Sequence, residues 1–371
     1  MSKKTIRPVR PVLLISEQTV SHYPTVLARL LVGLADQSIP VVLVCPPQCE
    51  VQSLLFGAVE VIRYPGVVFP LAERFDRKRL MATLGNYDLT VLHCLCETKA
   101  SLARMLARHL DIPYVLTINS LHARRTGLSV SSKRCVSIAC PTASIARSMR
   151  GLYPHLAERV SVIGFGTFVE NGCCCFSNAN ELPSIVMACD LRLARDFECV
   201  FKAISDLVLD HYEFSVIVMG QGRAESAIRQ MMAQMGLQQT VTIVPELHPW
   251  RSVLSAGDIY LVPQPLSRFC SYLLETMSVG VAVAGCKGGV DDLLVNKQTA
   301  EVFDSNDPVS IRVALQTLLG CHEYARTLAL GAQDFLRMHY SVSRMVEKVM
   351  HTYDQATEWA YGLDTISEEG S

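Results

Sequence analysis

Short apolar runs rich in β-branched residues recur along the first 166 residues. Helical patterns such as PTVLARLLVGLADQ (24–37) and KASLARMLARHLD (99–111) lie between several of them. Continuous apolar strands separated by amphipathic helices predict a parallel sheet that is covered on both faces. The expected strands are PVLLIS (11–16), PVVLVC (40–45), VEVIRY (59–64), DLTVLHC (88–94), PYVLTIN (113–119), VSIACP (136–141) and VSVIGFG (160–166).

The alternation stops at a polar, cysteine-rich stretch, VENGCCCFSNANELP (169–183), and then restarts. The later strands are expected at SIVMAC (184–189), EFSVIVMG (213–220), TVTIVP (240–245), DIYLVP (258–263), GVAVAG (280–285) and AEVF (300–303). The sequence therefore predicts an α/β protein with two doubly wound, Rossmann-like domains facing a cleft.

We expect the first domain to cover residues 1–168 and the second to cover residues 184–340, with residues 169–183 as the linker between them. A last helical pattern, VSRMVEKVMHTYDQATEWAYG (342–362), follows the second domain. We expect residues 341–362 to form a helix that packs back on the N-terminal domain.

Composition narrows the classes of function. The chain has 371 residues, of which half are hydrophobic and 19% charged, and its formal net charge is −1. These values fit two or three domains of about 100–200 residues, and they exclude a disordered chain or a bulk nucleic-acid binder. No apolar run approaches the roughly 18–20 residues that span a bilayer. We therefore expect a cytoplasmic protein.

The basic start MSKKTIRPVRPVLLIS resembles a signal peptide, but Ser16, Glu17 and Gln18 interrupt its apolar stretch. Two interpretations of this start remain. It is either a solvated tail or a segment that is weakly attracted to anionic lipid, which would keep the protein at the membrane periphery. The basic residues concerned are Lys3, Lys4, Arg7 and Arg10.

Fourteen cysteines raise the question of a metal site. The chain has no C-x-x-C pair, and HCLC (93–96) lacks a second pair at zinc-ligand spacing. The run Cys173-Cys174-Cys175 cannot surround one tetrahedral zinc without strain. We expect no metal or cofactor, and reduced thiols that pack as small hydrophobes, as at the buried strand ends Cys45, Cys140 and Cys189.

Ligands of open α/β sheets sit beyond the carboxyl ends of the strands. In the second half, one strand ends at Gly220-x-Gly222 before a helix, a turn that either lets the backbone approach phosphate or only closes the chain. Another strand ends at Glu246. The segment PLSRFCSYLLETMSVG (265–280) predicts a buried helix that begins near Phe269, carries Glu275 and is capped by Ser267.

The order of these signals resembles the GT-B glycosyltransferases of the group-1, or family 4, type. The resemblance rests on GQGRAESAIRQMMAQMGLQQTVTIVPEL, LSAGDIYLVPQ, LLETMSVGVAVAGCKGGVDDLLVNKQTAEVF and HYSVSRMVEKVMHTYDQ, and more loosely on residues 85–166. It implies transfer of a sugar from a nucleotide diphosphate sugar to a glycan, lipid-linked or protein acceptor, usually with retention and without a metal.

The resemblance also implies roles for individual residues on the donor side. The family's two glutamates, eight positions apart, fall on Ser267 and Glu275; the second, which binds the ribose hydroxyls, is kept, and the first is lost. Gly222, Glu246, Phe269 and Cys270 fall in the same expected nucleotide-sugar site. Small glycines of the family are replaced by Cys270 and its neighbour Arg268, whose bulk would obstruct the pyrophosphate.

The family's pyrophosphate-binding lysine falls on Arg195, which can bind phosphate in a bidentate manner. Its arginine falls on Asp190, unless a shift of two residues lets Arg192 replace it. On the acceptor side the family's histidine falls on Asn119. His93 ends a strand there, either as an acceptor-side residue or as a satisfied structural histidine.

Three functions follow from this mixture of kept and lost residues. The first is a divergent cytoplasmic glycosyltransferase in polysaccharide, lipid-glycan or glycoconjugate assembly. The second is a non-catalytic GT-B-like subunit that regulates a partner transferase. The third is a sugar-nucleotide epimerase on the same fold.

Overall fold

The computed structural model describes residues 8–64, 70–121, 127–178, 180–247 and 249–368, and side chains are described outside 70–76 and 360–368. Lys3, Lys4 and Arg7, which we considered as a lipid-attracted start, lie outside the described residues. The chain divides into two compact units. Residues 1–166 and 342–371 form the N-terminal unit, and residues 167–341 form the C-terminal unit.

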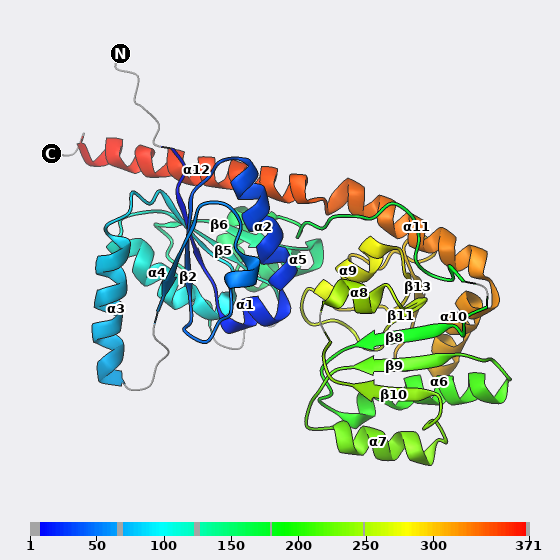
Figure 1. Ribbon diagram of the computed structural model, residues 1–371. Helices are drawn as coiled ribbons and strands as arrows, with labels where there is room; N and C mark the ends of the chain where they lie inside the picture. The colour runs from blue at the N-terminus through cyan, green and yellow to red at the C-terminus, as the bar shows by residue number, and fades with distance from the viewer. Residues whose placement is uncertain (1–7, 65–69, 122–126, 179, 248, 369–371) are drawn as a thin grey trace. The chain divides into compact units, whose positions relative to one another are not determined.

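The N-terminal unit is built on a parallel sheet of seven strands in the order β3-β2-β1-β4-β5-β6-β7 (Figure 1). Its inner strands are buried along their whole length, as their continuous apolar sequences predict. The strands are β1 (Pro11–Leu14), β2 (Val41–Cys45), β3 (Val59–Arg63), β4 (Val91–Cys94), β5 (Tyr114–Thr117), β6 (Cys135–Cys140) and β7 (Val160–Val162).

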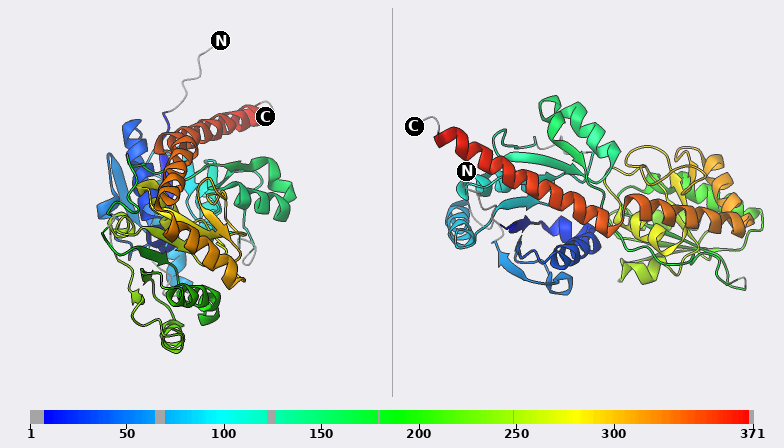
Figure 2. Two further views of the ribbon diagram at one scale, coloured as in Figure 1. Left: turned by 90° about the vertical axis from the view of Figure 1, so that its right-hand side faces the viewer. Right: turned by 90° about the horizontal axis from the view of Figure 1, so that it is seen from above.

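Helices connect these strands, and the last helix of the chain joins them. Both views of Figure 2 show α12 running along this unit, where it contacts α2 and strands β4, β5 and β6. Gly33 on α2 allows this contact, because a Cβ atom there would lie 2.1 Å from Val346 Cγ2. The helices are α1 (Glu17–His22), α2 (Pro24–Asp36), α3 (Pro70–Leu84), α4 (Ala100–His109), α5 (Ala143–Leu152) and α12 (Val342–Glu368).

The C-terminal unit contains a second parallel sheet, with six strands in the order β10-β9-β8-β11-β12-β13. Each strand coincides with an apolar run that the sequence predicts. The strands are β8 (Ser184–Ala188), β9 (Ser215–Met219), β10 (Val241–Val244), β11 (Ile259–Val262), β12 (Ala282–Cys286) and β13 (Glu301–Phe303). The two sheets with their helices confirm the predicted α/β class and its two Rossmann-like domains.

The helices of this unit are α6 (Glu198–Leu209), α7 (Glu225–Gln234), α8 (Trp250–Leu254), α9 (Ser271–Val279), α10 (Pro308–Gly320) and α11 (His322–His339), with a 3-10 turn η5 (Ala194–Phe197) before α6. The segment that precedes β8 is held on the unit by α9. The amides of Cys174 and Cys175 both donate to the carbonyl of Gly280, which ends α9 in the left-handed region at φ +78°.

The strand order of each sheet reverses at one point. In the N-terminal unit this switch point lies between β1 and β4, and in the C-terminal unit it lies between β8 and β11. Because ligands of doubly wound sheets bind beyond the carboxyl ends of the strands that flank a switch point, these two places define where a site is expected.

Candidate functional site

Two turns flank the switch point of the C-terminal unit. The turn after β8 carries Arg195 on η5, and its exposed guanidinium makes no hydrogen bond or ion pair with another described residue. On the same turn the guanidinium of Arg192 pairs with the carboxylate of Asp190 at 2.6 Å. The negative charge at Asp190 is therefore matched by a neighbouring cation, and Arg195 retains a positive charge for an anion.

The turn after β11 is joined to η5 by a hydrogen bond from Gln264 Nε2 to the carbonyl of Asp196. Of the predicted donor-site residues on this turn, Ser267 is exposed, Cys270 is half-buried and Phe269 is buried in the core. The structure therefore brings Arg195 and the 267–270 turn to one edge of the sheet, while the ring of Phe269 serves the packing below it.

Our prediction that Ser267 caps a helix starting near Phe269 was wrong. Helix α9 begins at Ser271, and its N-cap is Cys270, whose sulfur lies 3.5 Å from the amide of Leu273. Before that point the carbonyl of Leu266 accepts from the amide of Val290 at 2.7 Å, in a bridge to the turn after β12.

The glycines after β9 are explained by packing. A Cβ atom on Gly220 would lie 2.0 Å from the carbonyl oxygen of Cys189, and one on Gly222 would lie 2.2 Å from that of Leu191. The two turns after β8 and β9 therefore touch through their backbones, as the hydrogen bond from the amide of Ala224 to Leu191 also shows. Gly222 remains exposed at the sheet edge.

Glu275 lies inside α9 with no exposed side-chain surface. Its Oε2 is 3.8 Å from Nη1 of Arg251 on α8, a residue whose side chain is 26% exposed. A buried carboxylate is strongly disfavoured without a compensating cation or hydrogen bonds. Arg251 supplies a compensating cation for the Glu275 carboxylate at this position.

A second polar contact joins α8 and α9 one helical turn earlier. Glu246 Oε1 accepts from Trp250 Nε1 at 2.9 Å and from the hydroxyl of Tyr272 at 2.6 Å. The two rings pack with their centroids 4.4 Å apart. Burial, and next the hydrogen bond to Glu246, raises the pKa of the Tyr272 hydroxyl, which therefore stays a proton donor to Glu246.

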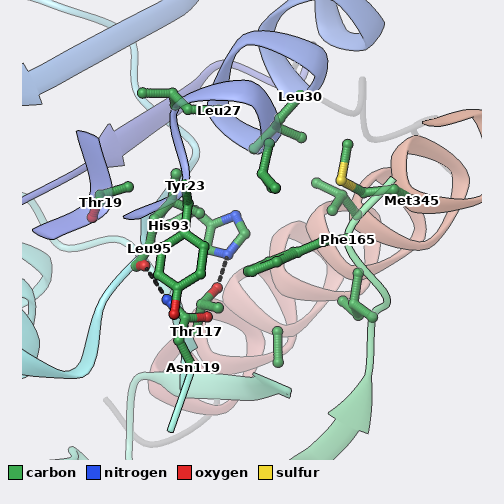
Figure 3. Close-up of a pocket in the computed structure, with 14 residues that line it drawn as sticks. Thr19, Tyr23, Leu27, Leu30, His93, Leu95, Thr117, Asn119, Phe165 and Met345 are labelled. Carbon is green, nitrogen blue, oxygen red and sulfur yellow. Dashed lines mark hydrogen bonds between the residues drawn. The ribbon is translucent and has the colours of Figure 1, made fainter. Parts of the chain in front are cut away.

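The N-terminal unit contains a small cavity of about 30 Å³, shown in Figure 3. This volume suits about two water molecules at roughly 10–15 Å³ each. Both predicted acceptor-side residues, His93 and Asn119, line it. The remaining lining is mostly apolar and comes from α2, α12 and the end of β7: Val26, Leu27, Leu30, Ile163, Phe165, Met345 and Val349, with Thr19, Tyr23, Leu95, Thr117 and Ala139 completing it.

Both ring nitrogens of His93 are bound within the unit. Nδ1 lies 2.8 Å from the hydroxyl of Tyr353 on α12, and Nε2 lies 2.8 Å from Oγ1 of Thr117 on β5. Burial lowers the pKa of His93 to about 3, so the ring is neutral near pH 7. These contacts match a satisfied structural histidine, the second of the two roles that the sequence left open.

Asn119 differs from His93 in having an unused polar atom. Its Nδ2 donates to the carbonyl of Leu95 at 3.1 Å, while its Oδ1 is buried and has no hydrogen-bond partner. The residue is 4% exposed. A buried acceptor without a partner costs about 1–3 kcal/mol, so a hydroxyl group or water that reaches this atom would be stabilised.

Four residues of these contacts were not predicted from the sequence: Arg251, Tyr272, Thr117 and Tyr353. Tyr272 had a local signal, because it lies three residues before Glu275 and therefore on the same face of α9. The other three reach the site through tertiary packing, for which the sequence gives no periodic signal. All fourteen cysteines are free thiols: eight are buried, five, among them Cys189, are half-buried, and Cys321 is exposed. Among the described residues no group of three or more His, Cys, Asp or Glu is arranged for a metal ion.

Comparisons with known proteins agree with this architecture. Residues 177–334 match the model of the family "Glycosyl transferases group 1". The chain resembles the gpi3 subunit of phosphatidylinositol N-acetylglucosaminyltransferase from Schizosaccharomyces pombe, with 28% identity over 246 residues. The match covers 64% of this chain but about half, 49%, of that protein.

Solved structures resemble the fold over nearly the whole chain. The Anabaena protein HepE in complex with UDP-glucose matches with a TM-score of 0.77 at 12% identity, covering 94% of this chain and 100% of that one. The sucrose-phosphate synthase of Thermosynechococcus elongatus gives 0.72 at 14% identity, covering 94% and 99%. A glycosyltransferase from Rickettsia africae gives 0.75 at 12% identity, with the same coverage of both chains.

Two parallel sheets of this order, each with a switch point and flanking helices, define the GT-B fold. The family match covers nearly all of the C-terminal unit. The chain therefore has the GT-B fold, and its residues 177–334 match the glycosyl transferase group 1 family, which the sequence resemblance had indicated. Within the described part of the chain, every helix is too short or too polar to cross a membrane.

Proposed function

We propose that the chain is a glycosyltransferase that moves a sugar from a uridine diphosphate sugar to a lipid acceptor, with retention and without a metal ion. The observation that carries the proposal is the group 1 match over residues 177–334, which includes the whole switch-point edge with Arg195, Gly222, Glu246, Cys270 and Glu275. The complexes of the Anabaena neighbour with UDP and with UDP-glucose support a uridine nucleotide.

In this proposal the diphosphate lies between η5 and the start of α9. The guanidinium of Arg195 and the N-terminus of α9 supply positive charge to the departing nucleotide diphosphate. Glu275 accepts hydrogen bonds from the ribose hydroxyls, which a carboxylate can take from two neighbouring groups at once. Ser267 leaves the donor sugar without the carboxylate that the family has there, and this slows transfer.

We extend the proposal to phosphatidylinositol as the acceptor and N-acetylglucosamine as the sugar, because the curated relative carries these words in its name. A lipid acceptor implies a protein that works at the surface of a membrane. In the N-terminal unit the acceptor hydroxyl would donate to Oδ1 of Asn119, the buried acceptor that has no partner in the cavity. His93 would hold α12 against β5 and take no proton.

A thermal-shift screen tests the donor side. The ligands are uridine, the diphosphates UDP, GDP and ADP, and the sugar nucleotides of these diphosphates. We expect UDP and a UDP-sugar to raise the melting temperature. A ligand at 100 times its dissociation constant adds about 2.7 kcal/mol, which corresponds to several degrees for a unit of this size.

Transfer is then measured with UDP-N-acetylglucosamine and vesicles that contain phosphatidylinositol, with and without EDTA. Glycolipid that forms equally in EDTA supports the proposal. A nucleotide response without glycolipid from any lipid, glycan or protein acceptor contradicts the transferase, and formation of an isomeric sugar nucleotide identifies an epimerase.

A second candidate function is a non-catalytic GT-B-like subunit that binds a partner transferase. Two observations favour it: Ser267 stands at the position of a family carboxylate, and the relative is itself named as a subunit. This candidate predicts no melting shift with any nucleotide sugar and no transfer by the chain alone.

A further inference from the structure

The polar contacts around Glu275 single out one residue that the donor-site proposal does not use. Arg251 on α8 has three groups of oxygen atoms around its guanidinium. Nε binds Glu170 Oε1 at 2.9 Å, Nη2 binds the carbonyl of Phe168 at 2.5 Å, and Nη1 faces Glu275 Oε2 at 3.8 Å. A planar guanidinium fork suits such a set of oxygens, and a lysine ammonium fits it less well.

Glu170, which binds Arg251 from outside, is itself fixed on the C-terminal unit. The amide of Glu170 donates to the carbonyl of Ser278 on α9 at 2.9 Å, and Nη2 of Arg337 on α11 donates to the carbonyl of Glu170 at 2.7 Å. Arg251 is therefore oriented by a frame attached to the same helix that carries Glu275. Its direction is set before any ligand binds.

The electrostatic consequence falls on Glu275. This carboxylate has no exposed surface, whereas Glu170 is about half exposed and shares its charge with solvent. At 3.8 Å, and with little water between the two groups, the attraction of Arg251 for Glu275 is larger than for an exposed pair. Removal of the cation would leave a buried carboxylate without its compensating charge, which is costly.

We propose that Arg251 is a positioning residue of the nucleotide site: it holds the Glu275 carboxylate oriented within α9, and nucleotide affinity depends on it although it does not contact the nucleotide. The inference rests on the proposed binding of ribose by Glu275. It assigns α8 and the segment of residues 168–170 a role in donor binding that neither the family resemblance nor the sequence spacing indicated.

The test compares five forms of the full chain: wild type, Arg251→Met, Arg251→Lys, Glu275→Gln and the double variant Arg251→Met with Glu275→Gln. Glu170→Gln is the matched control, because it removes the other carboxylate of Arg251 and leaves Glu275 in place. UDP affinity is measured by calorimetric titration, and the melting temperature of each variant is measured without ligand.

We expect Arg251→Met to weaken UDP binding about tenfold and Arg251→Lys to restore only part of the affinity, because lysine keeps the charge without the planar fork, while Glu170→Gln stays within twofold of wild type. In the Glu275→Gln background, Arg251→Met should cause no further loss of affinity. The melting temperature of Arg251→Met should fall by several degrees, and the double variant should recover part of that loss, because the uncompensated charge is then absent.

Three results would overturn the inference. The first is an unchanged UDP affinity in Arg251→Met, and the second is an Arg251→Met change that lowers UDP affinity equally in the wild-type and Glu275→Gln backgrounds. The third is a Glu275→Gln variant that binds UDP as the wild type does. In each of these the wild type still binds UDP, so the proposed transferase function stands, and only the third result also removes the ribose-binding role of Glu275. If the wild type does not bind UDP, both the proposed function and the positioning role fail. If in addition the double variant is no more stable than Arg251→Met, the stabilising charge pair between Arg251 and Glu275 is excluded as well.

Discussion

Replacing His93 with glutamine should remove a large part of the pH dependence of stability in the N-terminal unit. Burial lowers the pKa of this imidazole to about 3, compared with about 6.5 in an unfolded chain. The unfolded state therefore takes up a proton first as the pH falls. The contribution of the neutral His93 to the free energy of unfolding is fully present above the unfolded pKa, and it is lost as the pH drops from about 6.5 towards 3.

The expected size of the effect follows from these two values. Between pH 7 and pH 5 the imidazole becomes protonated in the unfolded state, while it stays neutral in the folded state. At pH 5 the pH lies about 1.5 units below the unfolded pKa of about 6.5. At about 1.4 kcal/mol per unit this costs the folded state about 2 kcal/mol. The His93→Gln variant loses the contacts to Tyr353 and Thr117 at every pH, so it starts less stable, but it has no such loss on acidification.

The assay is urea unfolding at pH 7 and pH 5, followed by the fluorescence of Trp359 on α12 in a Trp250→Phe background. Trp359 then reports on the N-terminal unit alone, since the chain contains two tryptophans. His155→Gln is the matched control, because His155 is an exposed histidine of the same unit. The gap in unfolding free energy between wild type and His93→Gln should narrow by about 2 kcal/mol at pH 5.

If both proteins lose the same stability between pH 7 and pH 5, the buried neutral state of His93 is refuted. If the difference in unfolding free energy between wild type and His155→Gln narrows by the same amount at pH 5, the effect does not arise from burial of His93.

Two further predictions concern the donor side. Arg195→Ala should weaken UDP binding far more than uridine binding, in a salt-sensitive manner, because the lost contact is between opposite charges; calorimetric titration at low and high salt measures this, and equal weakening of both ligands would assign Arg195 elsewhere. Ser267→Ala should change the unfolding free energy by less than about 0.5 kcal/mol, because Ser267 is exposed and lies outside α9; a loss of about 0.5–2 kcal/mol in urea unfolding would instead indicate a helix cap.

The sequence predicted the strands well because the inner strands of both sheets are buried on both faces and therefore carry continuous apolar runs. It was less accurate at the ends of helices, as at α9. There Leu266 bridges to the turn after β12, and the helix begins only at Ser271, after the N-cap Cys270. Helix α8 was not predicted, since five residues, Trp250–Leu254, are too few to show a helical period.

Site residues were predictable where they follow a strand and less so where a partner comes from another element. Arg195 and Ser267 lie beyond β8 and β11, at the sheet edge that the alternation indicated. The partner of Glu275 could not be found in the same way, because Arg251 is 24 positions earlier on a short helix and meets Glu275 only through packing. The hydrogen bonds of His93 to Tyr353 and Thr117 depend on tertiary contacts for the same reason.

The central claim is that the C-terminal unit binds a uridine nucleotide at its switch-point edge. Photoaffinity labelling with 5-azido-UDP, followed by mass spectrometry of the peptides, tests this directly. The account predicts labelling that excess UDP abolishes and that lies within residues 186–292, which include the turns after β8 to β12. UDP-sensitive labelling confined to residues 8–166, or none anywhere in the chain, would contradict it.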